Sequence, residues 1–231
     1  MRFGKRGRET RQLSSSCQHR LNSYAAAAAA GVGVALTNPM EAKIIYRPAH
    51  HVIRDGGSYR LDFTGNGSTD LIFRNQFFHT CGTDGQCFST QSLTVQLAGE
   101  DRVAHNLYGA EALKQGMFIG PKRPFHGGKE LMVKVFAGSA GSSGSGSWIN
   151  VNNRYLGVKL SINGTPHYGW ARLNVRVQPP LTITATLTGY AYETVPGKPI
   201  IAGKTKGADV ITLEPGSLAR LAQGSAWRLG K

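Results

Sequence analysis

The chain has 231 residues, 40% of them hydrophobic, and carries a formal net charge of +14. This length suits one domain and is sufficient to bury a hydrophobic core. Beyond residue 42 no apolar stretch approaches the roughly 18 residues of a transmembrane helix, which excludes a permanent membrane span there.

The first 42 residues have the charge and hydropathy order of a secretory signal peptide. Six basic residues precede an apolar block, Tyr24 to Leu36, and a short segment then ends at Ala42. This is the order of a charged region, an apolar region and a cleavage site. A buried alanine-rich helix is the alternative interpretation. We place cleavage after Ala42, so a mature chain from Lys43 is expected to be secreted, periplasmic or on the cell surface.

Removal of this leader leaves 21 basic and 11 acidic residues, a net charge of +10, and two of the three cysteines, Cys81 and Cys87. An even pair of cysteines that closes a short glycine-rich loop in an exported chain predicts a disulfide. The basic residues are scattered along the sequence, whereas a nucleic-acid surface is typically a clustered patch. No nucleic-acid partner is therefore expected.

From Lys43 onward the pattern is typical of an all-β protein. Short runs rich in β-branched and aromatic residues are bounded by glycine, asparagine, aspartate or proline. About nine strands are expected, in a single-domain antiparallel β-sandwich of jelly-roll type over residues 43–205. Six of these runs are 43–46, 59–63, 70–78, 93–97, 131–136 and 199–202. Only Ala110–Gln115 looks helical, and the glycine- and serine-rich segment 138–147 is expected to be a mobile loop.

The three remaining strands lie between residues 155 and 193, around the strongest turn signal in the chain. Asn163-Gly164 separates two alternating runs, and a two-residue turn of this type needs positive φ at both positions. The turn predicts a register in which Ile162 opposes Thr165 and Trp170 opposes Gly157. The aliphatic residues then share one face, which is expected to form the core: Leu156, Val158, Leu160, Ile162, Leu173, Val175 and Val177.

The opposite face of these strands is aromatic and rich in threonine. In the simplest register Tyr190 lies beside Tyr168, and Thr188 lies beside Trp170. One interpretation is that this face packs under a second sheet or a loop, because such residues are ordinary strand formers. The other is an exposed platform for sugar rings, formed by Tyr168, Trp170, Tyr190 and Tyr192.

The segments NGTPHYGWARLNV and TLTGYAYETVPGKPIIAGK resemble a group of uncharacterised secreted bacterial proteins of the PEP-CTERM-associated type. The resemblance covers about the last 80 residues well, and the earlier segments KIIYRP and LDFTGNGSTD loosely. It implies export, and no activity is assigned to the group. Residues 206–231 are expected to be a C-terminal tail, a degenerate sorting tail that lacks the apolar helix of its relatives.

The segment LDFTGNGSTD has the oxygen spacing of a calcium-binding loop. Its candidate ligands at positions 1, 3, 5 and 9 are Asp62, Thr64, Asn66 and Asp70. Gly67 stands at position 6, but Phe73 stands where a closing glutamate is required. A weak structural calcium site and a simple hairpin turn through Asn66-Gly67 both remain open, and no other cofactor is expected.

Other metal-binding and catalytic patterns are not found in the sequence. His50 and His51 are adjacent, so an extended strand points them to opposite sides. The remaining histidines show no ligand spacing: His79, His105, His126 and His167. The chain also lacks the usual hydrolase and phosphate-binding motifs. A glycosidase needs two carboxylates, for which Glu130 and Glu193 form the best available pair.

Three classes of function therefore stay open. We favour an exported, non-enzymatic β-sandwich of the cell envelope or extracellular matrix that binds glycans through its aromatic strand face. A secreted carbohydrate-active hydrolase and a protein that binds anionic polymers through its basic surface are the alternatives. The expected partners are polysaccharides or cell-envelope components, and the sequence does not indicate the oligomeric state.

Overall fold

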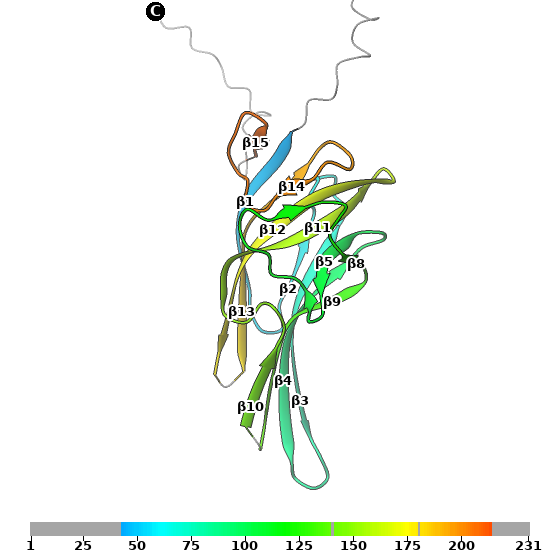
Figure 1. Cartoon of the computed structure of the whole chain (residues 1–231). Coiled ribbons are helices and arrows are strands. Elements are labelled where there is room, and N and C mark those ends of the chain that lie inside the picture. The colour runs from blue at the N-terminus through cyan, green and yellow to red at the C-terminus, as the bar shows by residue number, and fades with distance from the viewer. Residues whose placement is uncertain (1–42, 140, 180, 214–231) are drawn as a thin grey trace, which may run out of the picture. The chain divides into compact units, whose positions relative to one another are not determined.

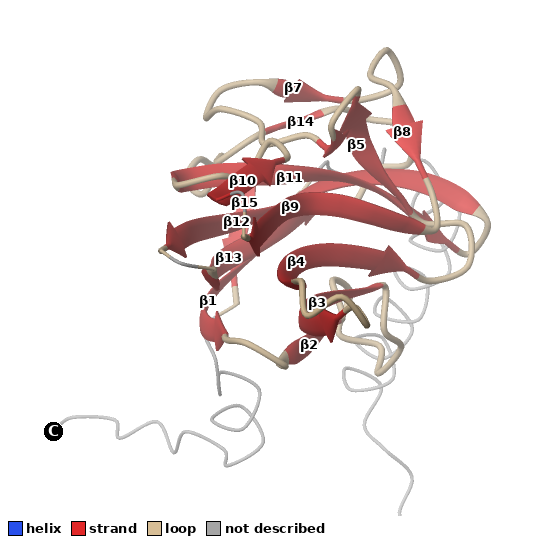
Figure 2. Cartoon of the chain, turned by 90° about the horizontal axis from the view of Figure 1, so that it is seen from below, coloured by secondary structure: helices blue, strands red, loops and turns tan. Residues whose placement is uncertain are grey.

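The computed structural model of the chain describes residues 43–139, 141–179 and 181–213 (Figure 1). The predicted signal peptide, residues 1–42, and the last part of the predicted tail, 214–231, lie outside the described residues. Figure 2 shows strands and loops throughout the described part, which has no helix. Accordingly, none of its elements is a helix long and apolar enough to span a membrane. The all-β prediction is confirmed.

The larger sheet has eight strands in the order β15-β1-β13-β12-β11-β5-β6, with β8 paired to β5. These strands are β1 (Ile44–Ile53), β5 (Arg102–Asn106), β6 (Gly109–Ala110), β8 (Phe125–His126), β11 (Val151–Ile162), β12 (Thr165–Gln178), β13 (Thr182–Glu193) and β15 (Val210–Thr212). Strand β15 pairs with β1 in parallel, so that Ile44 lies opposite Val210. The fold therefore continues beyond residue 205, and the domain end predicted there was wrong.

The second sheet has five strands in the order β10-β9-β4-β3-β2. They are β2 (Ser58–Leu61), β3 (Leu71–Cys81), β4 (Cys87–Leu97), β9 (Lys129–Gly138) and β10 (Gly141–Ser145). The chain crosses between the two sheets after β1, β4, β8 and β10. Strand β10 corrects the loop prediction for residues 138–147, because its glycine and serine backbone pairs with β9 from Gly141 to Ser145.

A third, two-stranded sheet consists of β7 (Phe118–Ile119) and β14 (Ile200–Ile201). A helix was predicted for Ala110–Gln115, the segment before β7, but this segment is not helical. Leu113 instead exchanges two backbone hydrogen bonds of 3.0 Å with Tyr155 of β11, and its side chain is buried. These long-range contacts override a weak local helix preference. Together with the two large sheets, the described residues form more strands than the nine predicted.

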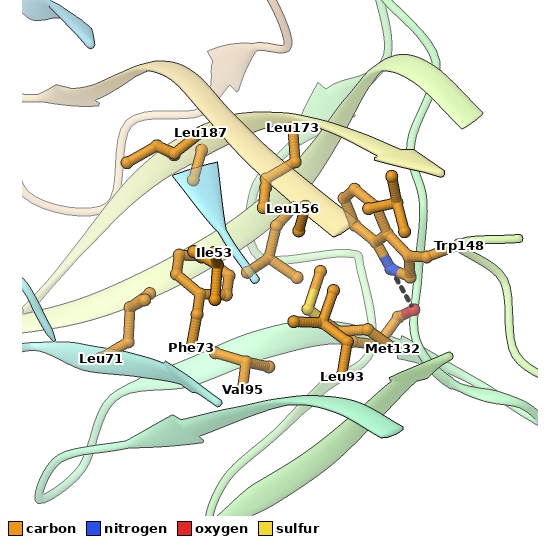
Figure 3. Packing of buried hydrophobic residues seen from close by; sticks show 14 of the residues in the cluster. Ile53, Leu71, Phe73, Leu93, Val95, Met132, Trp148, Leu156, Leu173 and Leu187 are labelled. Carbon is orange, nitrogen blue, oxygen red and sulfur yellow. Dashed lines mark hydrogen bonds between the residues drawn. The ribbon is translucent and has the colours of Figure 1, made fainter. Parts of the chain in front are cut away.

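The main hydrophobic core lies between the two large sheets (Figure 3). The larger sheet contributes the aliphatic face predicted from alternation, and the five-stranded sheet contributes Phe73, Leu93 and Val95. Trp148 closes one side of the core, where its indole N–H donates a 2.9 Å hydrogen bond to the carbonyl of Ala110. This bond satisfies the one polar group of a fully buried ring.

The predicted β11–β12 register is confirmed. Asn163 and Gly164 have φ values of 51° and 75°, as the two-residue turn requires. Gly157 lies opposite Trp170, and Leu160 lies opposite His167. Antiparallel alternation then directs the aliphatic residues of both strands to the main core.

Asp101, the residue directly before β5, has a buried side chain. Its Oδ1 accepts a 2.8 Å hydrogen bond from the backbone N–H of Ser161. Burial raises the pKa of Asp101 to about 6, and the nearby Asp70 carboxylate adds to the rise, while the Ser161 hydrogen bond opposes it. Asp101 therefore binds its proton more tightly in the folded chain than in the unfolded chain.

This shift predicts a pH dependence of stability. The contribution of Asp101 is fully present below about pH 4 and is lost as the pH rises to about 6, because ionisation is penalised only in the fold. Asp101→Asn stays neutral and is expected to match the wild type at pH 4 and to exceed it at pH 7 by roughly 1–3 kcal/mol. Urea unfolding at both pH values measures this difference. The exposed neighbour Glu100 provides the control, Glu100→Gln, and equal gains in both variants would contradict the prediction.

Candidate functional site

The predicted aromatic platform is not exposed. Trp170 is 0% exposed and Tyr168 is buried beside it, on the face of the larger sheet that β7 and β14 cover. Ile119 and Ile200 belong to the same buried cluster. The Trp170 ring also contacts Tyr155 edge to face, with the ring centroids 5.3 Å apart. The packed interpretation of this face is therefore correct, and the sugar platform at Tyr168 and Trp170 is wrong.

Tyr190 and Tyr192 do not share the face of Trp170 either. The β12–β13 register shifts between Arg172 and Leu173, so Ala191 and not Tyr190 shares a face with Trp170. A bulge of this kind reverses the side-chain alternation beyond it. Both tyrosines consequently turn toward the main core, where the Tyr190 ring meets Phe63 at 5.3 Å. The simple alternation assumed for β13 was wrong after Leu187.

An exposed aromatic surface does exist, on the outer face of the five-stranded sheet. Phe78 of β3, Phe88 of β4 and Phe136 of β9 are 58%, 45% and 37% exposed. Thr90 lies opposite both Phe78 and Phe136, and the rings of Phe88 and Phe136 are 5.8 Å apart. We call these three side chains the Phe face. Buried Phe73, an odd-numbered residue of β3, marks the opposite face of the sheet, toward the core.

A row of polar side chains borders the Phe face on the side toward the body of the sandwich. It consists of Gln76, Ser92, Lys134 and Ser145, one from each of the strands β3, β4, β9 and β10. These residues lie directly opposite one another in successive strand pairs, so their side chains point to the same side as the Phe face. Rings and hydrogen-bonding groups thus form neighbouring rows on one surface.

The Phe face lies on the part of the sheet that extends past the core. The first half of β3 is buried on alternate residues, whereas its last five residues are all exposed. Figure 1 shows the β3–β4 hairpin reaching far below the β11–β12 hairpin. The predicted disulfide between Cys81 and Cys87 is present, and it joins the last residue of β3 to the first of β4. It closes the end of this hairpin.

The predicted calcium loop uses its oxygens to accept hydrogen bonds from its own backbone. Both carboxylate oxygens of Asp62 accept loop N–H groups, from Gly65 at 2.6 Å and from Gly67 at 2.7 Å. Asp70 accepts from the N–H of Phe63, also at 2.6 Å. The hairpin-turn interpretation accounts for this geometry without an ion, and calcium binding at Asp62, Thr64, Asn66 and Asp70 stays a prediction.

The two carboxyl groups of this loop are perturbed in opposite directions. Burial alone would raise the pKa of Asp62, but the hydrogen bonds from Gly67 and Gly65 hold it below its usual value. Burial raises the pKa of Asp70, helped by the charge of Asp62 and opposed by the Phe63 hydrogen bond. The anionic form is therefore favoured at Asp62 and disfavoured at Asp70.

The structure brings together His105 of β5, His126 of β8 and Glu130 of β9, which sequence spacing did not connect. His105 Nδ1 lies 2.9 Å from Glu130 Oε2, and His126 Nδ1 contacts the other oxygen, Oε1. The side chain of Glu130 is only 7% exposed. The three residues come from three strands, and the pairing of β5 with β8 places His105 and His126 near each other. This pairing is not visible in the linear sequence. The one linear signal is the segment HGGKE, in which a glycine pair lets His126 turn back toward Glu130.

The same contacts separate the two carboxylates considered for glycoside hydrolysis. Glu193 lies at the end of β13, where its Oε1 accepts the N–H of Val195 and its Oε2 pairs with Lys198 at 3.2 Å. Glu130 is held by the two histidines instead. The structure gives no contact between the two carboxylates.

Comparison with known proteins adds no relative. No family model, no curated protein and no solved structure matches the chain.

Proposed function

We propose that this chain is an exported β-sandwich that binds glycans of the cell envelope or extracellular matrix through the Phe face. The observation that carries the proposal is the exposure of Phe78, Phe88 and Phe136 together on one side of a projecting sheet. Contiguous exposed apolar side chains mark binding surfaces, because burial of such groups on contact is favourable.

The polar row beside the Phe face favours a glycan over a purely apolar ligand. A sugar presents C–H faces that stack on aromatic rings and hydroxyl groups that need hydrogen-bond partners. Gln76 and Lys134 supply an amide and an ammonium group, and Ser92 and Ser145 supply hydroxyls. The neighbouring rows therefore match the two sides of a sugar ring better than a surface of one kind would.

Export is supported by two features of the chain. The leader-like segment precedes Lys43 in the sequence, and the disulfide between Cys81 and Cys87 is of a kind that persists in oxidising compartments. N-terminal sequencing of protein recovered outside the cytoplasm is expected to begin at Lys43. A full-length chain confined to the cytoplasm with free thiols would contradict this part of the proposal.

Binding of the purified protein to an array of soluble and insoluble polysaccharides tests the proposed surface. Phe78→Ala and Phe88→Ala are each expected to weaken glycan binding about tenfold, in the range of a buried aromatic contact at an interface. Phe77→Ala is the matched control. Phe77 is also exposed and adjoins Phe78 in β3, but it points to the other side of the sheet.

Repeating the array at low and high salt separates the remaining function classes. Stacking on sugars is expected to persist at high salt, whereas binding that depends on the basic charge would weaken. Release of new reducing ends from a bound glycan would indicate a hydrolase instead. Equal binding by Phe78→Ala and Phe77→Ala would show that the Phe face is not the contact surface.

A further inference from the structure

The cluster formed by His105, His126 and Glu130 is built unlike an ordinary surface ion pair. A carboxylate that is almost fully buried receives a histidine ring on each of its two oxygens. The two rings also lie against each other, with centroids 5.0 Å apart. Burial of a charged carboxylate is costly unless cations or hydrogen-bond donors compensate it. All three side chains converge from separate strands on one point.

We propose that these three residues bind a divalent first-row transition metal ion of the zinc class. The ligand atoms of His105, His126 and Glu130 all lie within 4.8 Å of one another. In a tetrahedral site with metal–ligand bonds of about 2.0–2.1 Å, neighbouring ligand atoms are about 3.3 Å apart. Small side-chain rotations are sufficient for this spacing, because the His126 side chain is 64% exposed and has room on its solvent side.

The donor set selects the class of ion. Two imidazole nitrogens and one carboxylate oxygen suit zinc, iron, cobalt, nickel or copper, whereas calcium and magnesium require mainly oxygen ligands. Three protein ligands leave a position for water, so the site is open rather than closed. The other convergent group in the described residues, around His79, includes Cys81 and Cys87. Their sulfurs form the disulfide, so they are not thiolate ligands.

The position of the cluster indicates what the ion does to the fold. His105 and His126 belong to β5 and β8 of the larger sheet, and Glu130 belongs to β9 of the five-stranded sheet. A bound ion therefore links the two sheets directly, across the edge of the sandwich. Strand β8 has only two residues, so it gains most from this additional link. The inference is independent of the proposed glycan surface.

Thermal unfolding with added metal tests the site. The protein is purified without a polyhistidine tag, treated with a chelator and titrated with zinc chloride. At a zinc concentration about 100 times the dissociation constant, the melting temperature is expected to rise by about 5–10 °C. Cobalt chloride is expected to give the visible absorption of a tetrahedral Co²⁺ site, and magnesium chloride is expected to change neither signal.

Variants assign the effect to the cluster. His126→Ala, at an exposed position, is expected to keep the fold and to lose both the zinc shift and the cobalt absorption. Glu130→Gln keeps the shape of the side chain but removes the anionic ligand, and it is expected to weaken zinc binding at least tenfold. His50→Ala, which removes an exposed histidine of β1, is the matched control and is expected to bind as the wild type does. No zinc shift in the wild type, or the same shift in His126→Ala, would overturn the proposal.

Discussion

Replacement of Trp170 by alanine is expected to lower the free energy of unfolding by about 3–5 kcal/mol, the range for large aromatic side chains lost from a core. Trp170 is fully buried between the larger sheet and the β7–β14 sheet, where Tyr46 and Tyr155 pack against its ring. Its indole N–H has no hydrogen-bond partner among the described residues. The loss therefore arises from burial and from the cavity left behind, and urea unfolding of the purified protein measures it.

Phe78→Ala is the matched control for this prediction, because it removes a large aromatic ring from an exposed position on another sheet. Its cost is expected to stay within about 0.5 kcal/mol, as for most surface substitutions. A cost at Trp170 as small as the cost at Phe78 would show that the face of the larger sheet is open. The exposed sugar platform would then become plausible again.

Replacement of Leu160 by alanine is expected to cost about 2–5 kcal/mol, whereas the change Lys159→Ala, one residue earlier, is expected to cost well under 1 kcal/mol. Leu160 is buried in the main core. Lys159 points to the opposite face and is only half-buried. In the strand register it lies opposite Tyr168 of β12 and Arg102 of β5. The lysine stem is expected to cover apolar surface while its ammonium group reaches water. Denaturant unfolding of both variants provides the comparison.

The two outcomes that would contradict this prediction have different meanings. A larger loss at Lys159 than at Leu160 would show that the β11–β12 register is shifted by one residue, since a shift sends each side chain to the other face. Comparable losses would show that the outer face is as tightly packed at Lys159 as it is at Trp170.

The features that sequence reasoning predicted correctly depend on contacts between near neighbours in the chain. The Asn163-Gly164 turn determines which residues of β11 and β12 oppose each other, because only a few residues and two positive φ values are involved. The disulfide between Cys81 and Cys87 follows in the same way from a short loop that brings the two sulfurs together. Glycine-rich turns between short strand-like runs were likewise sufficient to predict an all-β fold.

The errors in strand assignment concern one pairing between neighbouring segments of the chain and one pairing over a long sequence distance. A glycine- and serine-rich segment has little strand preference of its own, yet Gly141–Ser145 is a strand because β9 offers it an edge. Val210–Thr212 joins the sheet because the start of β1 lies beside it. The partner of Val210–Thr212 cannot be identified from local pattern, since this pairing depends on where the rest of the chain places an open edge.

What the sequence by itself determined is therefore the class of fold, the central hairpin and the face of that hairpin that forms the core. Only the tertiary structure decided what covers the other face. Alternation tells which side chains share a side, but the burial of Trp170 depends on segments near Ile119 and Ile200. Likewise, the bulge beyond Leu187 turned Tyr190 away from it. The cluster of His105, His126 and Glu130 exists for the same reason, because strand pairing assembles residues that no linear spacing connects.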